Sequence, residues 1–140
     1  MTFTQAVRSC LSQYAGFEGR APRSEFWWFT LFYILVDVAV IAVGGMLLTG
    51  SITSVQGNVD RSVSWYVMTA PNWLMIIAHL ALFLPTLAVT VRRLHDVGRT
   101  GWWILISFVP FFGILLLLFW WVQPSQREPN AYGPPLLPVR

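Results

Sequence analysis

The densest group of residues able to do chemistry lies in one short stretch, residues 88–103, between two long apolar runs. It holds three of the nine arginines, one of the two histidines and one of the six acidic residues. If this stretch ends a helix, residues spaced three and four apart share one face. Those residues are Arg92, His95, Asp96 and Arg99, with Arg93 pointing elsewhere. Such a face can bind phosphate or carboxylate groups, because guanidinium pairs with both.

Further charged residues precede the first apolar run, and the expected topology brings them to the same membrane face. The expected cytoplasmic charge cluster consists of Arg20, Arg23, Glu25, Arg92, Arg93, His95, Asp96 and Arg99. Three interpretations fit it: a structural network in which Glu25 and Asp96 bridge arginines, a contact site for anionic lipid or an acidic partner segment, or a catalytic His95–Asp96 pair. Neighbouring residues on a helix diverge by about 100°, which disfavours the catalytic pair.

A second polar site is expected inside the membrane, where Asp37 and His79 interrupt two apolar runs. Asp37 lies 11 residues after Phe26, and His79 lies 12 residues before Val91. At about 1.5 Å per residue, both lie roughly 17 Å from the same boundary. A carboxylate facing lipid costs several kcal/mol, so we expect the two side chains to meet. The contact between Asp37 and His79 would either hold the two helices together or form part of a proton or ion path.

Other kinds of site find little support in the sequence. The His and Asp residues show no metal-ligand spacing, and there is no Gly-rich phosphate loop or Ser/His/Asp arrangement. Cys10 is the single cysteine, so no intramolecular disulfide forms. The basic residues adjoin membrane spans, which disfavours nucleic-acid binding. We therefore expect no catalytic residues, no metal, no cofactor and no enzymatic activity.

Composition indicates the environment that positions these residues. The chain of 140 residues is 56% hydrophobic and 11% charged, whereas soluble domains average about 25% charged residues. So few charged groups cannot cover a surface exposed to water, and three runs are long enough for a membrane span. The sequence therefore predicts an all-α membrane protein that forms a single domain over residues 1–140.

The expected elements follow from periodicity and length. Residues 3–14 form a short amphipathic helix that lies in the membrane interface or, as the alternative, docks on the protein. Residues 123–140 form a Pro-rich tail that is extended and poorly packed. Three transmembrane helices lie between them, at 26–48, 73–91 and 102–122. A polar connection covers residues 49–71. The alternative for the third segment is a re-entrant hairpin, turning at residues 110–113 where Pro110 and Gly113 interrupt it.

Arginine distribution predicts the orientation. With three spans, six arginines lie on the side of the N-terminus and the 92–99 turn, and three lie on the other side. The positive-inside rule then places the N-terminus in the cytoplasm and the C-terminus in the periplasm. A re-entrant third segment would instead return the tail to the cytoplasmic side.

Three motifs in order resemble those of a known family. They are Gly-Arg-Ala-Pro-Arg-Ser-Glu-Phe-Trp-Trp-Phe (19–29), Arg-Arg-Leu-His-Asp-Val-Gly-Arg-Thr-Gly-Trp-Trp (92–103) and Pro-Asn-Ala-Tyr-Gly-Pro (129–134). Together they are similar to the domain-of-unknown-function 805 family of small bacterial inner-membrane proteins. The resemblance implies a location in the bacterial cytoplasmic membrane and implies no activity.

The functional expectation is a non-enzymatic scaffold or accessory protein. Its partners would be the lipid bilayer, anionic phospholipid through the cytoplasmic cluster, and a membrane protein partner or further copies of the chain. The alternative is a small oligomeric transporter or channel subunit that uses the Asp37/His79 seam. Three helices enclose no wide pore, so this alternative requires an oligomer.

Overall fold

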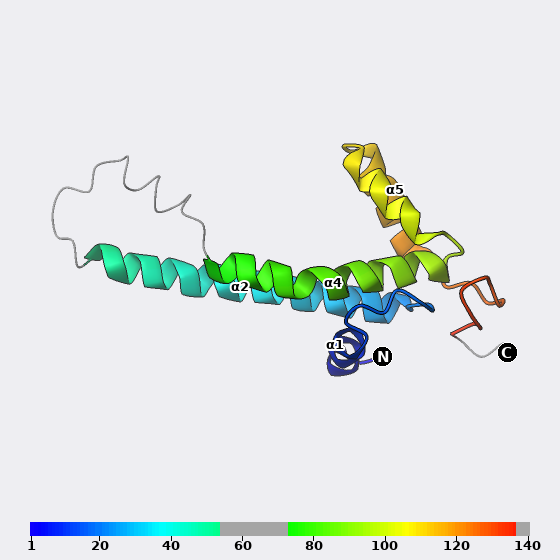
Figure 1. The fold of residues 1–140 in the computed structure, drawn as a ribbon, viewed down its shortest axis with the longest axis horizontal. Coiled ribbons are helices and arrows are strands. Elements are labelled where there is room, and N and C mark those ends of the chain that lie inside the picture. Colours follow the sequence, from blue (N-terminus) through cyan, green and yellow to red (C-terminus); the bar gives the residue numbers. More distant parts are fainter. Residues whose placement is uncertain (54–72, 137–140) are drawn as a thin grey trace. The chain divides into compact units, whose positions relative to one another are not determined.

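The computed structural model describes residues 1–53 and 73–136. The chain forms two compact units: one comprises Met1–Phe32 and Phe83–Arg140, and the other comprises Tyr33–Leu82. Helices account for most of the described residues, in the order α1, α2, α4, η1 and α5 (Figure 1).

The first helix, α1 (Phe3–Ser12), begins at a reciprocal cap. The Thr2 side chain accepts from the Gln5 backbone N–H, and the Gln5 side chain accepts from the Thr2 backbone N–H. This satisfies two N–H groups that the first turn leaves without helical partners. The helix ends two residues earlier than the expected 3–14. Ala6 and Cys10 are buried, so this face docks on the protein.

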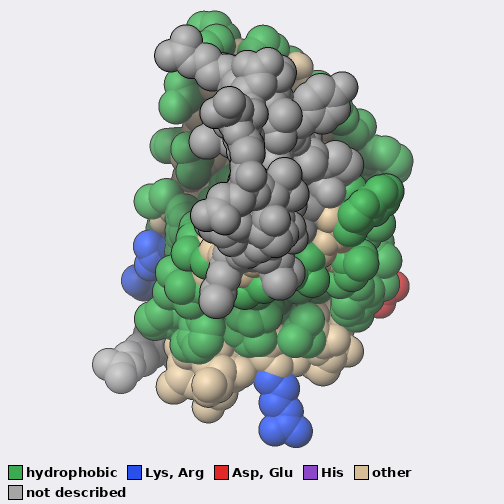
Figure 2. Space-filling model, turned by 90° about the vertical axis from the view of Figure 1, so that its left-hand side faces the viewer, with side chains coloured by type: hydrophobic (Ala, Val, Ile, Leu, Met, Phe, Trp, Pro, Cys, Tyr) green, Lys and Arg blue, Asp and Glu red, His purple; other side chains and the backbone are tan. Residues whose placement is uncertain are grey.

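Two long helices carry most of the apolar sequence: α2 (Arg23–Thr53) and α4 (Trp73–Asp96). Arg23–Val43 and Trp73–Asp96 have mean hydropathies of 2.1 and 2.2 and are long enough to cross a membrane. Only 17% and 22% of their most apolar stretches are buried within the protein, and the described surface in Figure 2 is mostly hydrophobic. Apolar surface of this extent favours contact with lipid.

Both long helices exceed their predicted bounds. α2 begins three residues before the expected 26–48 and continues to Thr53, so the expected connection over 49–71 starts later than predicted. The rest of that connection lies outside the described residues. α4 begins at Trp73 as expected and continues five residues beyond Val91, to Asp96.

The prediction of a third continuous helix over 102–122 is wrong. A 3₁₀ helix, η1 (Gly101–Phe108), is followed by a turn and by α5 (Phe112–Val122). Pro110 disfavours the helical conformation at Val109, which is extended, and Phe111 has a positive φ of 62°. The chain therefore reverses, and η1 packs against α5.

Two contacts define this helical hairpin. Trp103 near the start of η1 meets Trp120 near the end of α5, with ring centroids 5.2 Å apart. At the closed end, a Cβ added to Gly113 would lie 1.8 Å from the Ile106 carbonyl oxygen. Only glycine permits this close approach of the two backbones.

The tail folds back on the end of α4 instead of extending away from it. The Gln126 N–H donates to the Asp96 carbonyl at 3.2 Å, and Asn130 and Gly133 form an isolated bridge. In Figure 1 the orange-to-red tail lies beside the end of α4. Residues 126–134 therefore lie on the same side as the 92–99 turn. This contact differs from the expectation that a membrane span separates the tail from this turn, and the periplasmic location of the C-terminus stays a prediction.

Candidate functional site: a buried charge cluster

Six of the eight residues of the expected cytoplasmic cluster come together in the protein interior. This buried charge cluster consists of Arg20, Glu25, Arg92, Arg93, His95 and Asp96, all buried. The other two predicted members, Arg23 and Arg99, are exposed. The cluster joins the start of α2, the end of α4, the end of α5, α1 and the tail.

Asp96 is the electrostatic centre of the cluster. Its Oδ1 lies 3.0 Å from Arg20 Nε, and its Oδ2 accepts a hydrogen bond from Arg93 Nη1. The side chains of all three residues are at most 1% exposed. One carboxylate therefore compensates two buried guanidinium groups, and charge-assisted hydrogen bonds of this kind are the strong ones.

Arg20 uses its remaining N–H groups to hold the tail. Nη1 donates to the carbonyls of Glu128 at 3.1 Å and Pro134 at 3.3 Å. Nη2 donates to the carbonyls of Gln126 and Asp96. A single guanidinium thus ties the tail to the end of α4, where backbone carbonyls lack helical partners.

Arg93 and Arg23 together hold the end of α5. Arg93 Nε donates to the Trp121 carbonyl at 3.1 Å, and Arg93 Nη2 donates to the Gln123 carbonyl. Arg23 Nη1 donates to the Val122 carbonyl at 3.3 Å. Cations are favoured at helix C-termini because the last carbonyls carry partial negative charge. These bonds fix the returning arm of the hairpin to the cluster.

Glu25 connects α2 to α4 and to α1. Its Oε1 lies 3.3 Å from Arg92 Nη1 and accepts from Ser9 Oγ at 2.9 Å. Arg92 Nη1 also donates to Gln13 Oε1 at 2.8 Å. Burial, with a smaller contribution from Glu25, raises the pKa of the nearby Cys10 thiol to about 12. Cys10 is therefore protonated and unreactive at neutral pH.

His95 links the cluster to the tail through its ring and its backbone. Its Nδ1 lies 3.2 Å from the Gly19 carbonyl, and its ring stacks on Tyr132 with centroids 3.8 Å apart and an interplanar angle of 1°. Asn130 Nδ2 donates to the His95 carbonyl at 2.8 Å. His95 therefore has packing and hydrogen-bonding partners outside Asp96.

The predicted face of Arg92, His95, Asp96 and Arg99 is wrong in one respect. α4 ends at Asp96, and Gly98 adopts a positive φ of 72°, which directs Arg99 away from the helical register. Its guanidinium instead lies 5.3 Å from the centroid of the Trp120 ring. Arg93, which was expected to point elsewhere, pairs with Asp96 three residues later.

Sequence reasoning did not identify the tail as part of the site. Asn130 and Tyr132 contact His95, and the carbonyls of the tail hold Arg20. The signal for this was present in the motif at 129–134, where Asn and Gly favour a tight turn. Because the proline content predicted an extended tail, this motif was not assigned to the site.

The predicted intramembrane residues lie together in the unit formed by Tyr33–Leu82. His79 Nε2 is 3.7 Å from Asp37 Oδ1, and the two side chains are 42% and 25% exposed. His79 Nδ1 lies 2.8 Å from the Met75 carbonyl. Tyr33 meets the His79 ring edge-on, with centroids 5.7 Å apart.

The separation of His79 Nε2 from Asp37 Oδ1 is longer than a direct hydrogen bond, so the two side chains make a polar contact across the helices. A carbonyl only accepts, so the hydrogen bond to Met75 requires the hydrogen on His79 Nδ1. Among the described residues, no group of three or more His, Cys, Asp and Glu side chains is placed to hold a metal ion.

Comparisons with known proteins agree in pointing to one family. The family model described as "Protein of unknown function (DUF805)" matches residues 14–134. Inner membrane protein YhaI of Escherichia coli (strain K12) is 38% identical over 125 residues, covering 89% of each chain. Inner membrane protein YhaH of the same strain is 35% identical over 124 residues, again 89% of each. The uncharacterized protein YiiR is 30% identical over 88% of this chain and 70% of its own length. No solved structure matches the chain.

Proposed function

This chain belongs to the DUF805 family of proteins of unknown function, and from that premise we propose that it is a non-enzymatic scaffold or accessory protein of the bacterial inner membrane. Its buried charge cluster serves as an internal brace. The exposed arginines around that cluster contact anionic lipid headgroups. The names of its relatives YhaI and YhaH support the location.

The membrane arrangement that we propose has two spans and one re-entrant hairpin. α2 and α4 cross the bilayer, and η1 with α5 enters and leaves on the cytoplasmic side, so the described tail is cytoplasmic. Seven arginines then lie on this side: Arg8, Arg20, Arg23, Arg92, Arg93, Arg99 and Arg127. Of the other two arginines, Arg61 lies in the connection between the spans and Arg140 lies beyond the described tail. This asymmetry exceeds the six-to-three ratio of the three-span arrangement and fits the positive-inside rule better.

The observation that carries the proposal is the division of charges between interior and surface. Glu25 and Asp96 compensate the buried arginines, whereas Arg8, Arg23, Arg99 and Arg127 are exposed. In the same unit, the exposed acidic residues are Glu18 and Glu128. The described surface of this unit is therefore basic, and each arginine near an anionic membrane surface contributes about 1 kcal/mol of attraction.

The same division argues against catalysis by the cluster. His95 and Asp96 are buried and bonded to groups of the protein itself. Both Asp96 oxygens and His95 Nδ1 have partners within the protein, and an acid–base pair needs reach to a substrate proton.

Lipid analysis of polymer-extracted membrane discs tests the proposal. We expect phosphatidylglycerol to be enriched around the wild-type protein relative to the bulk membrane. The double variant Arg99→Gln/Arg127→Gln should reduce this enrichment, because it removes two exposed charges and keeps both the pairs of Asp96 and the Arg23 bond to the end of α5. An unenriched wild-type disc would overturn the proposed lipid contact.

One observation favours the second candidate, an oligomeric transporter or channel subunit. The Asp37–His79 pair joins two titratable side chains on facing apolar helices and leaves 42% of the His79 side chain exposed, and polar groups inside a membrane are costly in contact with lipid. Further copies of the chain would cover this face. Proton flux into liposomes, lost in Asp37→Asn, would support this candidate, while a detergent-solubilised monomer without flux would exclude it.

A further inference from the structure

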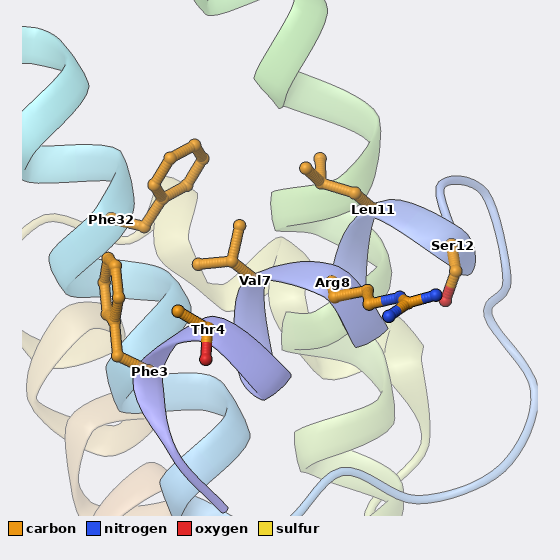
Figure 3. Close-up of a pocket in the computed structure, with 7 residues that line it drawn as sticks. All are labelled: Phe3, Thr4, Val7, Arg8, Leu11, Ser12 and Phe32. Carbon is orange, nitrogen blue, oxygen red and sulfur yellow. The ribbon is translucent and has the colours of Figure 1, made fainter.

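An open groove lies between α1 and the first part of α2, outside the buried charge cluster. Its volume is about 560 Å³, within the range of about 300–1,000 Å³ typical of ligand pockets. Its apolar walls are Phe3, Val7 and Leu11 of α1 and Phe32 of α2. Figure 3 shows these four side chains directed to the same side.

The helical register of α1 separates this groove from the docked face. Phe3, Val7 and Leu11 are each four residues apart, so they follow one side of the helix. Ala6, Ser9, Cys10 and Gln13 follow the adjacent side, which contacts the protein through Glu25 and Arg92. Phe3 anchors the groove by meeting Trp28 and Phe32, with centroids 5.9 Å and 6.4 Å away. The hydrogen bonds to the buried charge cluster are therefore made by the docked face of α1, and the groove lies on a different face.

The groove has one cationic edge. Arg8 and Ser12 line it beside the apolar wall, and Figure 3 shows the Arg8 side chain extending toward Ser12. Arg8 is exposed. Phe32 lies nine residues after Arg23, which is roughly 13 Å along α2. The groove therefore combines a guanidinium group of α1 with an apolar ring of α2 that lies inside the proposed membrane span.

We propose that this groove binds one phospholipid of the cytoplasmic leaflet, with an acyl chain against Phe3, Val7, Leu11 and Phe32 and the phosphate on Arg8. A phospholipid carries both required groups, a phosphate for the guanidinium and a hydrocarbon chain for the apolar walls. The inference rests on the proposed contact with lipid headgroups and assigns one specific lipid site to it.

Native mass spectrometry of the full chain in mild detergent, with added dioleoylphosphatidylglycerol, tests the site. The wild-type protein should retain one phospholipid. Val7→Trp should abolish the adduct by filling the groove, and Leu11→Trp should do the same from the other end of the wall. Arg8→Gln should reduce retention about tenfold, because a charge-assisted bond to phosphate is lost.

Matched controls separate the groove from general effects. Val38→Trp adds the same bulk to an exposed position of α2 outside the groove, and Arg127→Gln removes an exposed charge of the tail. Both should retain the lipid as the wild type does. Protection of Cys10 from maleimide reports that α1 remains docked in each variant.

The outcomes distinguish this inference from the proposed function. If Val7→Trp and Leu11→Trp, with Cys10 still protected, retain lipid as the wild type does, the groove assignment is overturned, even where phosphatidylglycerol enrichment in discs persists. If enrichment is absent in discs while both tryptophan variants lose the bound lipid, the groove stands and the broader surface contact fails.

Discussion

Asp96 is the residue on which the buried charges depend most. It compensates Arg20 and Arg93 at once, and its side chain is fully buried. Both arginines then use their remaining donors on backbone carbonyls of the tail and of α5. Loss of this one carboxylate leaves two guanidinium groups in the interior without a counter-charge, and removing one partner of a buried pair is far more destabilising than removing both.

We therefore predict that Asp96→Asn lowers the free energy of unfolding by about 3–5 kcal/mol. Unfolding in mixed micelles, followed by circular dichroism, measures this. Glu128→Gln is the matched control, because the Glu128 side chain is exposed and surface substitutions usually change stability by less than about 0.5 kcal/mol. Equal stabilities for the two variants would contradict the role assigned to Asp96.

At the scale of elements, the reversal between η1 and α5 determines where the chain goes after the second span. Pro110 interrupts the helix, and Gly113 allows the two arms to approach closely. Arg93 and Arg23 then fix the end of α5 next to the start of α2. The hairpin is thus held at its closed end by backbone contact and at its open end by charge.

Gly113→Ala should destabilise the hairpin, because its Cβ would lie 1.8 Å from the Ile106 carbonyl oxygen. Overpacking of this kind costs about 1–3 kcal/mol, measurable as a lower midpoint of thermal unfolding in detergent. For comparison, Gly16→Ala would place its Cβ 3.3 Å from Gln13 Cβ, a contact that a shift of a few tenths of an ångström relieves, and should cost less than Gly113→Ala. A wild-type midpoint for Gly113→Ala would show that η1 and α5 do not pack in this way.

At the scale of the whole molecule, the buried charge cluster and the hairpin together bring the residues that precede α2 and the described tail to the end of α4. Arg20 near the N-terminus binds tail carbonyls more than 100 residues away in sequence. A transmembrane third helix would separate these groups by the thickness of the bilayer, about 30 Å. The contacts of Arg20 with the tail are therefore compatible with the proposed two-span arrangement and incompatible with a third transmembrane helix.

Cysteine labelling of intact spheroplasts with a membrane-impermeant maleimide checks this arrangement. Glu18→Cys and Glu128→Cys should both label only after permeabilisation, whereas Asp60→Cys, between α2 and α4, should label directly. The native chain provides the control, because burial raises the Cys10 thiol pKa to about 12 and keeps it unreactive. Direct labelling of Glu128→Cys in intact spheroplasts would show that the tail is periplasmic and would contradict the two-span arrangement.

The sequence by itself determined the environment and much of the local geometry. Too few charged residues to cover a wet surface indicated a membrane protein, and run length indicated α2 and α4. Depth along a helix is a linear function of residue number, so the proximity of Asp37 and His79 followed from counting. The grouping of Glu25 and Asp96 with arginines followed from topology, because two antiparallel spans return to the same face.

Only the tertiary structure decided the path after Asp96 and which arginines are buried. Pro110 and Gly113 allow either a kinked span or a reversal, and the choice depends on contacts distant in sequence, such as Gly113 with Ile106 and Arg93 with Gln123. Likewise, Arg93 and Arg99 have the same side chain, but Arg93 lies within α4 and is buried, whereas Arg99 follows the end of α4 at Asp96 and is exposed. Local sequence fixes backbone preferences within a few residues, whereas burial and pairing depend on which surfaces the whole chain brings together.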